Sequence, residues 1–348
     1  MKRLSTLLIM WLCGAVAATV PSHASDPLEN LKKFSDFQKI DVKRLLEGEI
    51  LSQRGPLMNF PNGISTQICF FVPASPEEVF RLQQTWDPTR CSSLKIYASS
   101  GLNSPCQPRD FKKLHLDPED RPIKWLLEKT QTTTSGKMEL NLTISEAREL
   151  AACVGKDSSP DAIGSCWAKL LFERATAFQL KGLGGVMPYE TDGDFLYPAV
   201  QLRSMLQEQG KIIQEFAPLL QQTGMLGNVT EVSSLKPLYN WSFFDANHHA
   251  TLNLGAVYKL AVGDHYQLLD IDYYASSTYY AAATLYEVWP IHDGKKTGSI
   301  VWRGDFLSAP TLRYTKGIER IAFGVIMIQE VKKEIRCFLD NVRTSTRP

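Results

Sequence analysis

The sequence predicts an α+β fold in which a curved antiparallel sheet wraps a long C-terminal helix, with an all-α subdomain inserted into the sheet domain. A periodicity of two recurs between residues 239 and 307, in runs rich in aromatic and β-branched side chains. A helical apolar stripe follows over 317–342. A separate helical block over 141–222 divides these strands from two strand-like runs nearer the N-terminus. The sheet is therefore expected to form from two distant parts of the chain.

The N-terminus predicts a cleavable secretory signal over residues 1–24. Basic Lys2 and Arg3 precede an apolar stretch over 7–20, and a small-x-small pattern follows it. The stretch is shorter than the roughly 20 residues that span a membrane. The residues before Cys13 lack the small side chains that lipoprotein processing favours. We expect an exported protein, periplasmic or extracellular, with no transmembrane segment after the signal is removed.

Residues 25–135 are predicted to form the N-terminal part of the sheet domain. Ser75 caps a helix that begins at Pro76, and Glu78 completes a capping box. Turn-forming residues over 59–63 separate two strand-like runs. The expected elements are a helix over 28–47, strands over 49–57 and 64–72, a helix over 76–86, and short strands over 94–97 and 125–127.

Residues 140–225 are predicted to form the helical insertion, and residues 236–343 the C-terminal part of the sheet domain. The glycine-rich break at 182–185 lacks the preceding strand and following lysine of a phosphate-binding loop, so we interpret it as a hinge. We expect the insertion to serve as a lid or a partner surface. The expected elements are helices over 145–154, 160–180 and 198–222, strands over 239–244, 250–261, 266–274, 279–290 and 299–307, and a helix over 317–342 with an apolar stripe of Ile318, Ile321, Val325, Ile328, Val331, Ile335, Phe338 and Val342.

The charge balance argues against nucleic acid as a partner. Without Lys2 and Arg3 of the signal, the 38 basic residues fall to 36 against 37 acidic ones, a net charge of −1. Nucleic-acid-binding domains are instead strongly basic. The hydrophobic fraction of 44% is ordinary for a globular protein, which excludes disorder.

Six cysteines follow the signal, an even number that suits disulfides in an oxidising compartment. Cys91 and Cys106 flank one loop, and Cys153 and Cys166 flank another, so two local bridges are expected; buried free thiols are the alternative. The remaining two, Cys69 and Cys337, are expected to pack in the core. No pair has the Cys-x-x-Cys spacing of a zinc site, and neither a metal nor a cofactor is expected.

Three segments carry a resemblance to a known family. They read GEIL at 48–51, ISTQICFFVPASPEEVF at 64–80 and WDP at 86–88: a strand, a turn and a short capped helix. With the later strands and the closing helix, this order resembles the START and Bet v 1-like superfamily, which includes polyketide cyclase-like proteins and has the helix-grip fold. The helical insertion departs from the common pattern of that superfamily.

The resemblance implies a sheet that grips the C-terminal helix around an apolar cavity for a sterol, phospholipid, polyketide or other hydrophobic molecule. Gly324 on that helix either widens the cavity or lets a strand approach closely. Aromatic residues of the strands are ordinary cross-strand partners or line the cavity. The candidate ligand-binding residues are Tyr266, Tyr273, Tyr279, Trp289, Trp302, Arg303 and Gly324.

Asp270 and Asp272 share one face of their predicted strand. If this face meets the cavity, the carboxylates need partners, and Arg303 or Arg313 is the candidate. The pattern favours the alternative, in which this face meets solvent and the intervening Leu269, Ile271 and Tyr273 face the core. Arg303 and Asp305 are interpreted as an ion pair on the surface, which contributes little.

The histidines form no expected metal site. His248 and His249 follow Asp245 near a predicted turn, where such residues occur for conformational reasons. Adjacent strand residues also point to opposite faces. His265 follows Asp264 at another predicted turn.

Three functions fit these observations. The first is an exported protein that binds a hydrophobic small molecule or lipid without covalent chemistry. The second is a cyclase- or aromatase-like enzyme on the same fold with Asp270, Asp272 or His265 as acid–base groups. The third is a non-catalytic structural or interaction protein of the envelope with a filled core. We assign no catalytic residue, because no hydrolase signature is present.

Overall fold

The computed structural model describes residues 27–133, 139–155, 158–191, 194–227, 233–294 and 296–345, so the predicted signal over 1–24 lies outside the described residues. The strands are β1 (Leu51–Arg54), β2 (Gly63–Val72), β3 (Ile96–Gly101), β4 (Tyr189–Thr191), β5 (Asp194–Leu196), β6 (Leu238–Ala246), β7 (His249–Val262), β8 (His265–Ala275), β9 (Ala281–Asp293) and β10 (Lys296–Ser308). The α-helices are α1 (Pro27–Phe34), α2 (Val42–Leu46), α3 (Pro76–Thr85), α4 (Arg121–Thr132), α5 (Ile144–Val154), α6 (Pro160–Lys181), α7 (Pro198–Gln207), α8 (Gly210–Glu215), α9 (Ala217–Gln222) and α10 (Gly317–Ser345).

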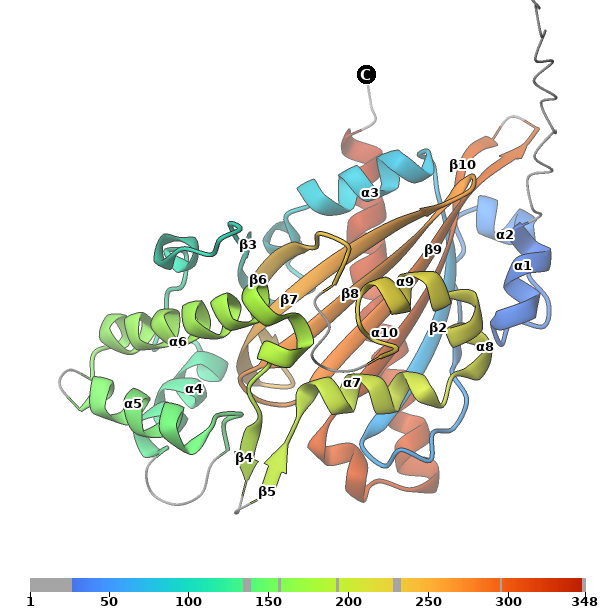
Figure 1. The fold of residues 1–348 in the computed structure, drawn as a ribbon. Helices are drawn as coiled ribbons and strands as arrows, with labels where there is room; N and C mark the ends of the chain where they lie inside the picture. Colours follow the sequence, from blue (N-terminus) through green and yellow to red (C-terminus); the bar gives the residue numbers. More distant parts are fainter. Residues whose placement is uncertain are drawn as a thin grey trace, which may run out of the picture.

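An eight-stranded antiparallel sheet in the order β1-β2-β10-β9-β8-β7-β6-β3 lies between two layers of helices (Figure 1). Consecutive strands from β6 to β10 pair with one another as antiparallel hairpins. Strand β2, from the N-terminal part of the chain, pairs with β10, where Trp302 lies opposite Cys69. Strands β4 and β5 form a separate hairpin. The prediction of an α+β fold with a large antiparallel sheet and a C-terminal helix is confirmed.

Three element predictions are wrong. The predicted helix over 28–47 is two short helices, α1 and α2, separated by residues 35–41. The segment 125–127 belongs to helix α4, not to a strand, because Asp120 caps the helix by accepting from the Ile123 N–H and buried residues recur every three or four positions. The predicted helix over 198–222 is three helices, interrupted at residues 208–209 just before Gly210 and again at Phe216, two residues before Pro218. Glycine and proline interrupt helices more readily than other residues do.

The sheet has two different faces. The face toward α3 and α10, here called the cavity face, carries Ile68, Phe70 and Val301. The opposite face, here called the aromatic face, carries Trp289 and Trp302 and packs against α1, α4 and the helices of the insertion. Because strand residues alternate between faces, each strand contributes to both.

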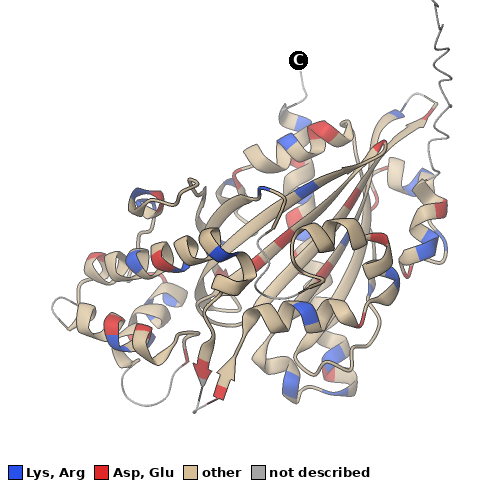
Figure 2. Cartoon of the chain, in the orientation of Figure 1, with Lys and Arg blue, Asp and Glu red and all other residues tan. Residues whose placement is uncertain are grey.

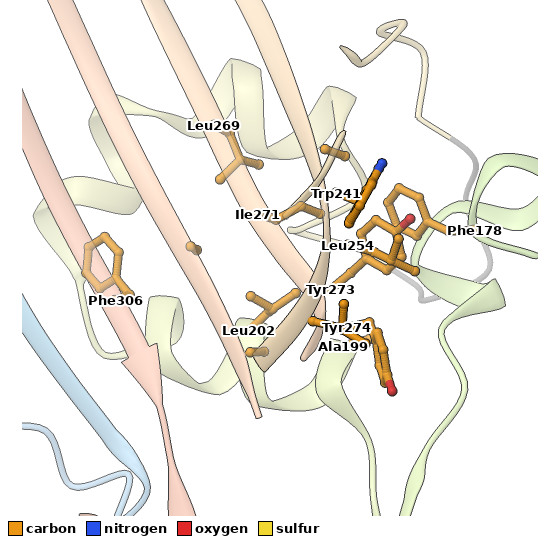
Figure 3. Packing of buried hydrophobic residues seen from close by; sticks show 14 of the residues in the cluster. Phe178, Ala199, Leu202, Trp241, Leu254, Leu269, Ile271, Tyr273, Tyr274 and Phe306 are labelled. Carbon is orange, nitrogen blue, oxygen red and sulfur yellow. The ribbon is translucent and has the colours of Figure 1, made fainter. Parts of the chain in front are cut away.

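Large rings pack against one another on the aromatic face. Phe34 of α1 lies edge-on to Trp302, with the ring centroids 4.9 Å apart. Phe178 of α6 stacks on Tyr273, with the centroids 3.8 Å apart. Figure 3 shows the Tyr273 and Phe178 rings together, with Leu202 of α7 nearby. The insertion is therefore part of the main core.

Helix α10 is buried against the sheet mainly along its second half. The predicted stripe is buried from Ile328 onward, whereas Ile318 and Ile321 near the start are 84% and 42% exposed. The buried half lies mainly over β1 and β2, at one edge of the sheet. The rest of the cavity face, toward β6 and β3, is left without this helix.

Two disulfides are present, which is consistent with the predicted export to an oxidising compartment. Cys153–Cys166 joins α5 to α6 as expected. The expected Cys91–Cys106 bridge is wrong, since Cys91 pairs with Cys337 of α10 across a Cα–Cα distance of 6.1 Å. Cys106 is instead a buried free thiol whose backbone N–H donates to Gln179 of α6. The pairing follows the docking of α10, which nearness in sequence does not reveal.

Candidate functional site

A cavity of about 770 Å³ lies between the cavity face and helices α3 and α10. Its lining comes from the end of α3, from β3, from the start of β6, from the middle strands and from one side of α10. Among the described residues, none from 139–227 lines it. The helical insertion therefore does not act as a lid over this cavity, because it packs on the opposite face of the sheet.

The walls of the cavity are largely apolar. Phe70 of β2 and Leu268 of β8 rise from the sheet, because alternate residues of these strands face α10. Phe338 of α10 closes the opposite side, edge-on to Trp86, with 5.7 Å between the ring centroids. An apolar lining of this kind favours a hydrophobic occupant.

Arg303 of β10 stands at the charged floor of the cavity and is 7% exposed. Its Nε donates to Asp305 at 2.8 Å, and a terminal nitrogen donates to Glu334 of α10 at 2.9 Å. Burial alone would lower the pKa of Arg303, but the two carboxylates hold the pKa well above its usual value. The guanidinium thus joins the sheet to α10.

Asp270 of β8 lies beside this pair and borders the cavity. No hydrogen bond to its carboxyl group is formed by the described residues. Protein atoms surround most of the Asp270 carboxyl group, and the residue remains partly exposed to solvent where it borders the cavity. Burial raises the pKa of Asp270 to about 8, since the neighbouring Asp272 adds repulsion and Arg303 offsets only part of it.

Asp272 lies one step farther along the same face and is fully partnered. It accepts from the Tyr279 hydroxyl and from Asn253 Nδ2, each at 2.8 Å. Burial still raises the pKa of Asp272 to about 6. Burial also raises the pKa of Asp305, despite its bond to Arg303. Figure 2 shows charged residues within the strands of the sheet as well as on the outer helices.

Two interpretations of this region are corrected. Asp270 lines the cavity, and Asp272 beside it is bonded to Tyr279 and Asn253, so this face is not simply solvent-facing. Leu269 and Ile271 do face the core on the aromatic side. The pair of Arg303 and Asp305 is buried, with exposures of 7% and 4%, and is not a surface pair. Helices α3 and α10 cover part of this face of the sheet, which the alternating pattern cannot reveal.

The predicted ligand-binding residues are dispersed. Of these candidates, Arg303 lines the cavity, and Tyr279 lies behind Asp272. Tyr266 lies on the surface, where its hydroxyl donates to Glu77 of α3 at 2.6 Å. The others are placed outside the cavity: Tyr273, Trp289 and Trp302 on the aromatic face, and Gly324 on α10.

Gly324 permits a close approach. A Cβ atom at Gly324 would lie 2.9 Å from Cδ of Arg54, a residue of β1. The position therefore accommodates a strand side chain, and it does not line the cavity.

The histidines lie apart from the cavity. His248 is in a turn with positive φ, and its N–H donates to Asp245. The His249 ring packs on Trp125, with 4.2 Å between the centroids. His265 faces the aromatic side, where its Nε2 is 3.0 Å from Oε1 of the buried Glu287. Within the described ranges, no three His, Cys, Asp or Glu side chains gather as metal ligands.

Sequence reasoning missed Glu334 and Tyr286 as lining residues. Glu334 falls between Val331 and Phe338 on the apolar side of α10, so an acidic residue inside that stripe is a signal for it. Tyr286 alternates with the buried Leu285 and carries its ring under Arg303, with Cζ 5.4 Å from the centroid. Only the pairing of β9 with β10 places it there.

No known family model matches the chain, and no curated protein is detectably similar to it. Over the part of the chain that the structure describes, no helix is long and apolar enough to cross a membrane.

Proposed function

We propose that this chain is an exported binding protein of START-like, helix-grip architecture that holds a hydrophobic small molecule or lipid between the sheet and α10. The observation that carries the proposal is the cavity of about 770 Å³. Small-molecule sites typically span about 300–1,000 Å³ and have mostly apolar walls with a few polar groups. The cavity has both features, since Phe70 and Phe338 face an Arg303-centred floor.

The docking of α10 supports the helix-grip interpretation. Its second half packs over β1 and β2, and α3 crosses β8 to β10, so the two helices flank the hollow. Transfer of an occupant from water would stabilise the complex by about 2.5 kcal/mol for each 100 Å² of its apolar surface that is buried. The hollow also argues against a structural protein with a filled core.

Native mass spectrometry and solvent extraction of the mature full-length chain test this proposal. We expect a co-purifying apolar molecule at one per chain. For a variant test, Val257→Trp fills the cavity from β7, whereas Ala261→Trp lies on the same strand outside the lining. Binding of the apolar dye N-phenylnaphthylamine should weaken at least about tenfold in the first variant only. An empty protein with no dye binding would refute the proposal.

A cyclase-like enzyme is the second candidate, and Asp270 is the observation that favours it. The group faces the cavity with its pKa near 8, which suits a general acid or base at neutral pH. Asp272 lies behind it, but His265 is on the other face of the sheet and cannot join them. Incubation of the extracted occupant with the wild-type chain and with Asp270→Asn distinguishes the two functions. An enzyme converts the molecule only when Asp270 is present, whereas a carrier leaves it unchanged.

A further inference from the structure

The charges around Asp270 are unbalanced. The groups that face it are Asp272 on its own strand, Tyr286 of β9, Arg303 and Asp305 of β10, and Glu334 of α10. Counted together with Asp270 itself, these residues contribute four carboxyl groups and one guanidinium. Water would screen such a cluster on the open surface, but Arg303 and Asp305 are only 7% and 4% exposed here, so the repulsion is screened less.

The protein's own hydrogen bonds leave one of the four acids without a partner. Arg303 bonds Asp305 and Glu334, and Asp272 accepts from Tyr279 and Asn253. The carboxyl group of Asp270 accepts no hydrogen bond from any described residue, and it is the one that lines the cavity beside the paired Arg303. An occupant can therefore reach this group directly.

We propose that the occupant carries a protonated amine on an apolar body and that Asp270 receives this amine at the floor of the cavity. The inference rests on the proposed binding function and specifies the class of ligand. An ammonium group would pair with the open carboxylate and offset the excess of acids around it. The apolar body would lie toward Phe70, Trp86 and Phe338.

Other head groups fit this floor less well. A carboxylate at the floor would lie against Asp270 and Glu334, and Arg303 there already bonds two acids. The other cation that lines the cavity, Lys113, is exposed to solvent. A neutral alcohol can bond to Asp270 but leaves the charge imbalance in place. A bare metal ion lacks a ligand set, because no three metal-binding side chains converge in the described residues.

The titration of Asp270 agrees with the geometry. Burial and the neighbouring Asp272 raise the pKa of Asp270 to about 8, and Arg303 offsets only part of this shift. At neutral pH the free protein therefore holds a proton on Asp270, and binding of an ammonium group should release it. The affinity for an amine should consequently rise between pH 6 and pH 8, as the cost of removing that proton falls.

Three probes with one chain length test the inference: decylamine, decanol and decanoate, titrated calorimetrically below their aggregation concentrations at pH 7. In the wild-type chain we expect the amine to bind at least about tenfold more tightly than the alcohol, and decanoate to bind most weakly. This ranking needs no variant. Titration in buffers of different ionisation enthalpy should show proton release with the amine alone.

The variant Asp270→Asn keeps the shape of the side chain and removes its charge. It should lose at least about tenfold in affinity for decylamine, and change its affinity for decanol by less than about twofold. Asp293→Asn, at an exposed position at the end of β9 and outside the cavity lining, is the matched control and should leave all three affinities unchanged.

The outcomes separate the two proposals. Equal binding of amine and alcohol, unaffected by Asp270→Asn, overturns the amine inference and leaves the hydrophobic-ligand proposal intact. If decanoate binds most tightly, the amine inference is also overturned and the hydrophobic-ligand proposal stands. Arg303 would then be the residue that binds the head group. Failure of all three probes in a chain that also purifies empty overturns both.

Discussion

The two faces of the sheet differ although the same strands build them. On β10, Trp302 enters the aromatic face and packs against Phe34, while the next residue, Arg303, borders the cavity. On β8, Tyr273 stacks on Phe178, while Asp270 faces the hollow. The comparison teaches that strand alternation assigns residues to faces, but the helices that cover each face decide whether it is filled.

Helices cover the two faces of the sheet to different extents. The aromatic face receives α1, α4 and the insertion helices. The cavity face receives α3 and α10, and α10 lies mainly over β1 and β2 and is buried mostly along its second half. The hollow extends from there to β3 and β6, which line its other side. Incomplete cover by α10 is thus the origin of the cavity.

Loss of the buried cation should produce the largest effect. Arg303→Met leaves Asp305 and Glu334 without their shared partner, and we expect the free energy of unfolding to fall by about 3–5 kcal/mol. Arg343→Met removes an exposed pair with Asp340 on α10 and should cost less than about 1 kcal/mol. Urea denaturation measures both, and equal losses would show that the floor pair is not structurally important.

Matched phenylalanine truncations sharpen the contrast between the faces. Phe306→Ala on the aromatic face should cost about 3–5 kcal/mol, because its ring is 1% exposed among close neighbours. Phe70→Ala should cost about 1 kcal/mol less, because one side of its ring already borders open space. Denaturation of the two variants under one condition makes the comparison. A larger loss for Phe70→Ala would mean that the cavity walls are closely packed.

The smallest effect should come from Asp270→Asn and should depend on pH. The raised pKa means that the folded chain binds this proton more tightly than the unfolded chain does. The contribution of Asp270 to the free energy of unfolding of the wild type is therefore complete below its ordinary pKa of 3.8. This contribution is lost as the pH rises toward about 8. The variant lacks this loss and should gain about 1 kcal/mol or more relative to wild type between pH 4 and pH 9. Thermal melts across this range test the sign, and a constant difference would contradict it.

Local patterns predicted most of the fold. The capping box at Ser75, whose hydroxyl accepts from the Glu78 N–H, placed the start of α3 at Pro76. The five runs after residue 236 became β6 to β10 with shifted ends. The prediction of a strand over 125–127 failed because a short apolar run fits a helix or a strand equally well.

The candidate site was only partly predictable. Arg303 was named, and Asp270 and Asp272 were correctly placed on one face of a strand. The surroundings of these three residues could not be predicted, because Glu334 reaches Arg303 only after α10 docks on the sheet. Trp289 and Trp302 were assigned to the ligand because aromatic side chains suit a core and a cavity equally, and the structure places both rings in the core.

The sequence by itself determined most of the elements, the alternation along each strand and the unusual charges within apolar runs, because these properties depend on neighbours a few residues apart. The tertiary structure alone decided the Cys91–Cys337 bridge, the position of the insertion behind the sheet and the half-docked α10. Those features depend on how segments far apart in the chain cover one sheet. A hollow is the space such segments leave between them, so no local pattern encodes it.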